Sequence, residues 1–140
     1  MQFEAGTFPS HPIRGVRAVY AWQSTCPSDF AEVVVDFEPG RAGITLETAP
    51  AMTVQGDVLT PEELSTYRAA IVAGVREEVA QLVPGTPAAV AVVLRKIRVH
   101  PVDSHPRSFH MVGRVAVRNA LGGLRPAPRP SVKPPPECRG

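Results

Sequence analysis

Apolar side chains recur at every second position in the first part of the chain, and this period predicts strands. Between Arg14 and Trp22 the alternation predicts a strand with one buried face. Phe30–Glu38 is rich in β-branched residues and predicts a second strand, which ends at Pro39-Gly40. Gly43–Thr48 predicts a third strand, antiparallel to the second. The segment that follows is ambiguous, and we assign it a short extended piece around Met52–Val54.

A fourth strand is predicted at Ala88–Val99. It opens with an almost continuous apolar run, as in strands buried on both faces, and then turns polar. We also expect Trp22, Met52 and Tyr67 to pack into the core.

The helical period of 3.6 residues appears twice. The first helix begins with Thr60 as N-cap, Pro61 at its first position and Glu63 three residues after the cap, and Pro84-Gly85 ends it. Its predicted buried stripe is Leu64, Tyr67, Ile71, Val75, Val79 and Leu82. Gly74 in this helix and Gly113 in the next indicate a close approach to a neighbouring element.

The second helix is predicted to begin at Asp103 or Ser104, with Pro106 in its first turn, and to end at Gly122-Gly123. One of its faces is apolar and the other is basic. The apolar face holds Phe109, Val112, Ala116 and Ala120. The basic face holds Arg107, His110, Arg114 and Arg118.

These elements predict one folded domain at residues 14–121, after a lead-in at 1–13 and before a basic, proline-rich tail at 122–140 for which we expect no fold. The chain has no apolar run long enough to span a membrane, and its first residues lack the pattern of a signal peptide. We therefore expect a cytoplasmic protein. Cys26 and Cys138 have no metal-site spacing and are expected to be unpaired thiols.

The net charge of +2 conceals an uneven distribution. Residues 1–93 hold five arginines against eleven acidic residues, a net charge of −6. Residues 94–140 hold ten basic residues against two acidic ones, a net charge of +8. A basic half favours a polyanionic partner such as RNA. The alternatives are that the two halves attract each other, or that the tail maintains solubility.

Several motifs, in their order, resemble one known family. Val33-Val34-Val35-Asp36-Phe37-Glu38-Pro39 is followed by a helix that contains Ala70-Ile71-Val72-Ala73-Gly74-Val75-Arg76-Glu77. The fourth strand leads into His100-Pro101-Val102-Asp103-Ser104, and Phe109 stands five residues on. Over residues 14–121 this series resembles the fourth domain of elongation factor G.

The resemblance implies an α+β two-layer sandwich: a four-stranded sheet with two helices on one face and a left-handed βαβ crossover, which is an exception to the usual hand. In that family the matching His lies in a tip loop that contacts RNA in the ribosomal decoding centre. The chain departs from the family at Ser24–Ser28, which replaces a glycine-rich loop, and at His105-Pro106. It also lacks a phosphate-binding GxxxxGK[ST] motif, so we expect neither GTPase activity nor a nucleotide partner.

The leading hypothesis is a non-catalytic domain without a cofactor that binds RNA or the ribosome. The candidate RNA-binding residues combine the tip loop, the end of the fourth strand and the basic helix face. They are Lys96, Arg98, His100, Asp103, Ser104, Arg107, His110, Arg114 and Arg118. The alternative is a protein-interaction module, for instance a homodimer, that uses the sheet face or a strand edge.

Two further classes receive less support from the residues. His100, His105 and His110 recur every five residues, whereas metal sites on a helix favour spacings of three or four. Asp103, Ser104, Ser108 and His110 include the residue types of a nucleophilic triad, but closeness in sequence does not give triad geometry. We therefore expect no metal and no catalytic activity.

Overall fold

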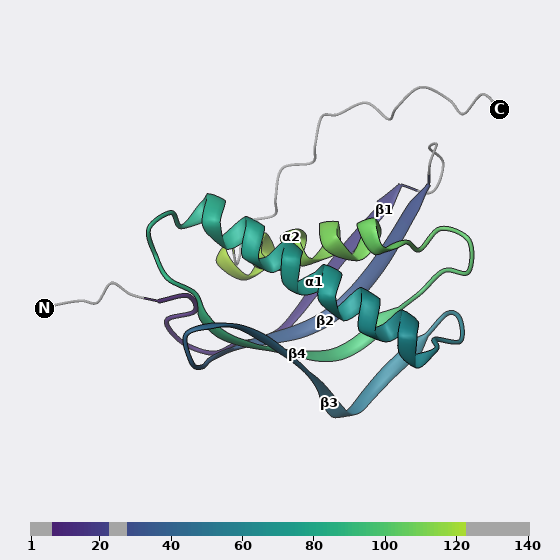
Figure 1. Ribbon diagram of the computed structural model, residues 1–140, viewed down its shortest axis with the longest axis horizontal. Coiled ribbons are helices and arrows are strands. Elements are labelled where there is room, and N and C mark those ends of the chain that lie inside the picture. The colour runs from purple at the N-terminus through teal and green to yellow at the C-terminus, as the bar shows by residue number, and fades with distance from the viewer. Residues whose placement is uncertain (1–6, 23–27, 123–140) are drawn as a thin grey trace, which may run out of the picture.

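The computed structural model describes residues 7–22 and 28–122. Six elements follow one another along the chain (Figure 1). They are β1 (Ile13–Trp22), β2 (Asp29–Pro39), β3 (Gly43–Gln55), α1 (Pro61–Leu82), β4 (Ala89–Arg98) and α2 (Pro106–Gly122). The predicted lead-in lies partly, and the predicted tail almost entirely, outside the described residues; Cys26 and Cys138 lie wholly outside them.

The strands form one four-stranded mixed sheet in the order β1-β2-β4-β3. β2 is antiparallel to both β1 and β4, while β3 is parallel to β4. The third strand therefore runs opposite to the second, as predicted, but β4 lies between them. β3 is also longer than predicted, because it continues through the segment around Met52–Val54 as far as Gln55.

Both helices lie on the same side of the sheet, which makes the molecule a two-layer α+β sandwich (Figure 1). α1 connects the parallel neighbours β3 and β4. Viewed with the helices above the sheet and both strands running from left to right, β3 lies nearer the viewer than β4 (Figure 1). This arrangement gives the crossover the left hand that the resemblance implied.

The core lies between the sheet and the helices. β2 contributes Ala31, Val33, Val35 and Phe37, and β4 contributes Val90, Val92, Leu94 and Ile97, all of them buried. The helices contribute a stacked pair, Tyr67 and Phe109, whose ring centroids are 4.3 Å apart. Tyr67 is therefore in the core and Met52 packs against it, as predicted.

Two apolar side chains do not follow the prediction. Trp22 is partly exposed at the end of β1, where its ring meets Tyr20 edge-on at 6.4 Å between centroids. Leu82, the last residue of α1, is 44% exposed, whereas the next residue, Val83, packs against the core.

The start of α1 is confirmed, whereas the start of α2 is later than predicted. Thr60 and Glu63 form a reciprocal capping box, with Pro61 in the first turn. α2 begins at Pro106, and the carbonyl of His105 accepts the N–H of Ser108. The Ser108 hydroxyl accepts the N–H of His105 in return. This leaves Asp103 and Ser104 outside the helix.

Helix side chains contact both edge strands of the sheet. Asn119 of α2 donates to the carbonyl of Arg17 in β1. Arg68 of α1 donates to the carbonyl of Leu46 in β3. Each contact ties one carbonyl of an edge strand to the helical layer.

Candidate nucleic-acid interface

The predicted basic face of α2 is turned largely toward α1. Arg114 and Arg118 donate to the two carboxylate oxygens of Glu78 at 2.7 and 2.8 Å. The Glu78 side chain is 1% exposed. Glu77 accepts from His110 at 3.0 Å and lies 3.1 Å from Arg114. The acidic and basic halves of the chain therefore attract each other here.

Two glycines at the helix crossing bring these charges together. A Cβ atom on Gly74 would lie 2.0 Å from the carbonyl oxygen of His110, and one on Gly113 would lie 2.5 Å from that of Ile71. The helix backbones are therefore in direct contact, as the two glycines predicted. At this separation the arginines of α2 reach the glutamates of α1 directly.

Arg107, the fourth member of the predicted face, binds the buried carboxylate of Asp29 in β2 at 2.6 Å. Ser108 donates to the same carboxylate. Each of the four residues is therefore paired with an acidic side chain, so they do not form one unpaired basic surface on α2. Arg107 and Arg118 keep about half of their side-chain surface exposed, but each is already paired.

The His100 loop is tied to the start of β2. Asp103 is buried and accepts a hydrogen bond from the Ser28 hydroxyl, and its carbonyl accepts the N–H of Phe30. The Ser104 hydroxyl donates to the carbonyl of Phe30 and accepts the N–H of His100. Asp103 and Ser104 therefore hold the loop in place.

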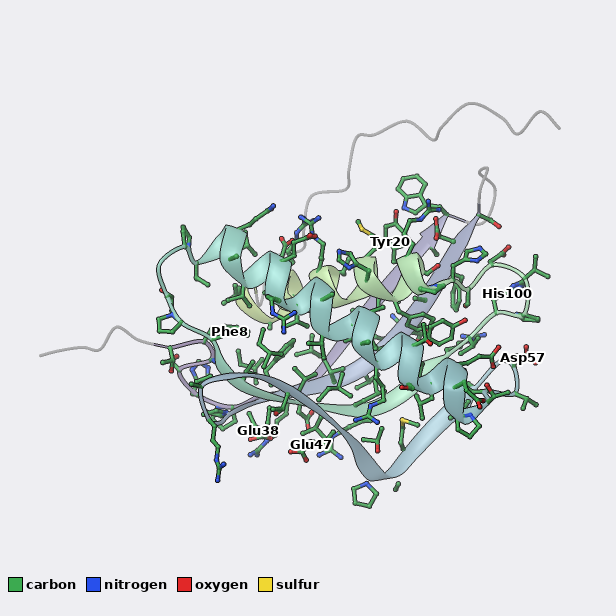
Figure 2. The ribbon with its side chains drawn as sticks, in the orientation of Figure 1. Phe8, Tyr20, Glu38, Glu47, Asp57 and His100 are labelled. Carbon is green, nitrogen blue, oxygen red and sulfur yellow. The ribbon has the colours of Figure 1, made fainter. Side chains whose placement is uncertain are left out.

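His100 lies at the end of the molecule that also holds Asp57, away from Phe8 and Glu38 (Figure 2). Its side chain is 41% exposed. Its Nδ1 atom accepts the N–H groups of Val102 and Asp103 at 3.2 and 3.1 Å, which fixes the orientation of the ring. Two apolar side chains at this end are largely exposed, Val58 at 81% and Val102 at 71%.

A second basic surface lies on the face of the sheet that carries no helix. We call it the basic sheet face and define it as Arg17, Lys96 and Arg98 around Glu32. The three cations lie 3.0, 3.5 and 3.6 Å from the Glu32 carboxylate. The Glu32 side chain is 4% exposed, whereas those of Arg17 and Arg98 are 63% and 51% exposed. Solvent therefore meets the cations, while the balancing carboxylate lies beneath them.

The pKa values of Glu32 and Glu78 are set by burial and by the cations paired with each carboxylate. Burial by itself raises the pKa of Glu32, but the hydrogen bond and charge of Arg17 and the charge of Lys96 outweigh it, so the pKa is lowered. Burial likewise raises the pKa of Glu78, and the hydrogen bonds from Arg118 and Arg114 outweigh it. Both carboxylates are therefore held in the charged form.

A β-bulge supplies part of the basic sheet face. The register between β2 and β4 shifts between Val34 and Val35, so that Val34 pairs with Lys96 and Val35 with Leu94. Arg95 is the extra residue, and both it and Lys96 point away from the core. Arg95 binds Asp36, a carboxylate that is also buried on this face.

Phe30 connects the basic sheet face with the His100 loop. The guanidinium carbon of Arg98 lies 6.0 Å from the centroid of the Phe30 ring. The His100 ring meets the Phe30 ring edge-on at 6.4 Å between centroids. Phe30 thus links Arg98 of the strand end with His100 of the tip loop, two parts of the predicted site.

Sequence analysis did not select Arg17, Phe30 or Glu32 for this site. Their signal is the alternation along β1 and β2, which assigns Arg17, Phe30 and Glu32 to faces opposite the apolar residues. That signal does not show which strands are neighbours, and the site depends on β1 and β4 flanking β2.

The other candidate chemistries receive no geometric support. Among residues 7–22 and 28–122, no group of three or more His, Cys, Asp or Glu side chains is arranged to hold a metal ion. Ser108 is buried against Asp29, and His110 is bonded to Glu77, so these two members of the hypothetical triad face different partners. Within the described residues, no helix is long and apolar enough to cross a membrane.

Comparison with known proteins adds evidence on the fold. No protein-family model and no curated protein sequence matches the chain. Among solved structures, the chain is similar to a crystal structure of a Thermus thermophilus protein, at 18% sequence identity and a TM-score of 0.56. The match covers 86% of this chain and 18% of that one, so the fold occurs there as a small part of a longer protein.

Proposed function

We propose that this protein is a non-catalytic RNA-binding domain, with ribosomal RNA as the preferred partner. It binds through the basic sheet face and the adjoining His100 loop. The resemblance to the fourth domain of elongation factor G supports an RNA partner at this loop. A ribosomal partner also implies a cytoplasmic location.

One observation carries the proposal: the arrangement of charge around Glu32. Arg17, Lys96 and Arg98 converge on a buried carboxylate; the two arginines are more than half exposed, and Lys96 is 28% exposed. A phosphate can then approach the guanidinium and ammonium groups without first displacing an exposed acid. Such contacts position a nucleic acid backbone and make its affinity depend on salt.

The test is RNA binding by the full chain, measured by gel shift and by cosedimentation with ribosomes. Lys96→Gln together with Arg98→Gln should weaken binding roughly tenfold or more at about 50 mM salt, because two phosphate contacts are lost. The slope of log K against log salt should become shallower by roughly 1.5.

The matched control is the double variant Arg41→Gln and Arg76→Gln. It removes the same charge from two exposed residues, one in the turn after β2 and one on α1. This control should bind RNA almost as the parent does. Failure of the parent to bind RNA at about 50 mM salt, or equal losses in the two double variants, would contradict the proposal.

A further inference from the structure

The cluster of Phe30, Arg98 and His100 has a feature that phosphate binding alone does not need. Phe30 is a partly exposed aromatic side chain on the helix-free face, close to Glu32 along β2. The Arg98 guanidinium stands over its ring at 6.0 Å, within the usual range of a cation–π contact. The Arg98 side chain is itself half-exposed, so its outer side is open to a ligand.

The main chain of Phe30 and the side chains of Arg98 and His100 are held in place by contacts within the protein. The N–H and carbonyl of Phe30 are bonded to Asp103 and Ser104. Arg98 is held from below by Glu32 at 3.6 Å. His100 is held by two main-chain N–H groups. A ligand that meets this cluster therefore finds ordered groups, and little conformational entropy is lost on binding.

The chemistry of the cluster selects a flat, anionic ligand. A guanidinium lying over an aromatic ring offers its other side to a further planar π system, and a nucleobase is such a system. Lys96 and Arg17 flank the same carboxylate as Arg98 and are positioned for phosphates attached to that base. Bases in a duplex are already stacked on their neighbours, so this cluster is suited to unpaired bases.

We propose that the Phe30–Arg98 pair is a stacking site for an unpaired base, and that the protein prefers single-stranded RNA to duplex RNA. This inference rests on the proposed RNA-binding function and specifies its ligand. Phosphates lie over Lys96, Arg17 and the N–H edge of the Arg98 guanidinium, one base stacks on the face of that guanidinium above Phe30, and His100 borders the base at its edge.

The experiment compares a fluorescently labelled single-stranded RNA with a duplex of the same sequence, by anisotropy with the full chain. The parent should bind the single strand more tightly. Phe30→Leu keeps an apolar side chain but removes the aromatic ring. Arg98→Lys keeps the positive charge but removes the planar guanidinium group. Each should weaken single-strand binding roughly 5- to 50-fold, leave duplex binding nearly unchanged and leave the salt slope intact.

Tyr20→Leu and Arg41→Lys are the matched controls. Tyr20 lies at the same end of the sheet but packs against the core on the helix-covered side, and Arg41 lies in the turn at the opposite end. Neither control should alter the preference for single strands. Thermal unfolding of each variant shows whether a loss of RNA affinity comes from misfolding.

Two outcomes separate this inference from the function on which it rests. Salt-dependent binding of both RNA forms with equal affinity, unaffected by Phe30→Leu in folded protein, would overturn the stacking site and leave the RNA-binding proposal standing. Binding of neither form at about 50 mM salt would overturn both.

Discussion

At the scale of single residues, the glycines at the helix crossing have the most restrictive environment. The sequence was sufficient to predict a close approach at Gly74 and Gly113, because glycine inside a helix is costly unless packing requires it. It was not sufficient to identify the neighbour, since a helical glycine can face a sheet as well as a helix. The structure identifies it: each glycine faces the main chain of the other helix.

Gly74→Ala should destabilise the protein by about 2–4 kcal/mol, because the added methyl group would lie 2.0 Å from the His110 carbonyl oxygen and the helices would have to separate. Gly122→Ala is the control, since its Cβ would have no neighbour within 4 Å, and it should be neutral or slightly stabilising. Urea denaturation of both variants measures the difference. Equal stability of the two variants would show that the helices are not in contact at this point.

At the scale of elements, the basic stripe of α2 shows where inference from the sequence alone ends. The spacing of Arg107, His110, Arg114 and Arg118 correctly predicted that they lie along one side of a helix. It could not show whether that side faces water or α1, because the answer depends on the crossing of two helices that are distant in sequence. Glu77 and Glu78 are visible in the sequence, but nothing in the sequence pairs them with the arginines of α2.

Glu78→Gln should lower the free energy of unfolding by about 3 kcal/mol, because it removes the charge that compensates both Arg114 and Arg118. Glu77→Gln is the neighbouring control. Its side chain is 46% exposed, so the same substitution should cost less than about 1 kcal/mol. Denaturant midpoints for the two variants give the comparison, and a larger loss in Glu77→Gln would refute the central role of Glu78.

The bulge in β4 is another feature that regular alternation of polar and apolar residues does not predict. Alternation alone would assign Arg95 and Lys96 to opposite faces of the strand, although both are polar. The extra residue lets both point away from the core, and it aligns Ile97 with Val33 on the buried side. The polar pair followed by an apolar residue is the signal in the sequence, but the register depends on β2.

At the scale of the whole molecule, buried carboxylates with lowered pKa values make stability depend on pH. Glu32 and Glu78 both have pKa values below the ordinary 4.5, so the unfolded chain binds protons more readily than the folded one as the pH falls. Their contribution to stability is therefore complete above the ordinary pKa, and it is lost progressively below it, as the pH falls through the folded values.

We expect the free energy of unfolding to change little above about pH 6 and to decrease below about pH 4.5. Circular dichroism during urea titrations across this range measures it. The double variant Glu32→Gln and Glu78→Gln should be less stable at neutral pH and should lose less additional stability in acid. If the double variant loses as much stability below about pH 4.5 as the parent does, the pH dependence comes from other carboxylates.

The overall architecture could be predicted in two steps: periodicity predicted four strands and two helices, and the resemblance implied that both helices lie on one side and that the crossover has the unusual hand. The position of the proposed RNA-binding surface could not be predicted in the same way. It depends on the strand order, which brings Arg17 of β1 and Arg98 of β4 to the two sides of Glu32 in β2.

The uncovered side of the sheet has a consequence for how such a domain diversifies. Its exposed cations, Arg17 and Arg98, lie outside the core between the sheet and the helices. Specificity can therefore change through substitutions of these exposed side chains while the core stays the same. Homologues that share this scaffold would then differ in what they recognise while their backbones remain superimposable.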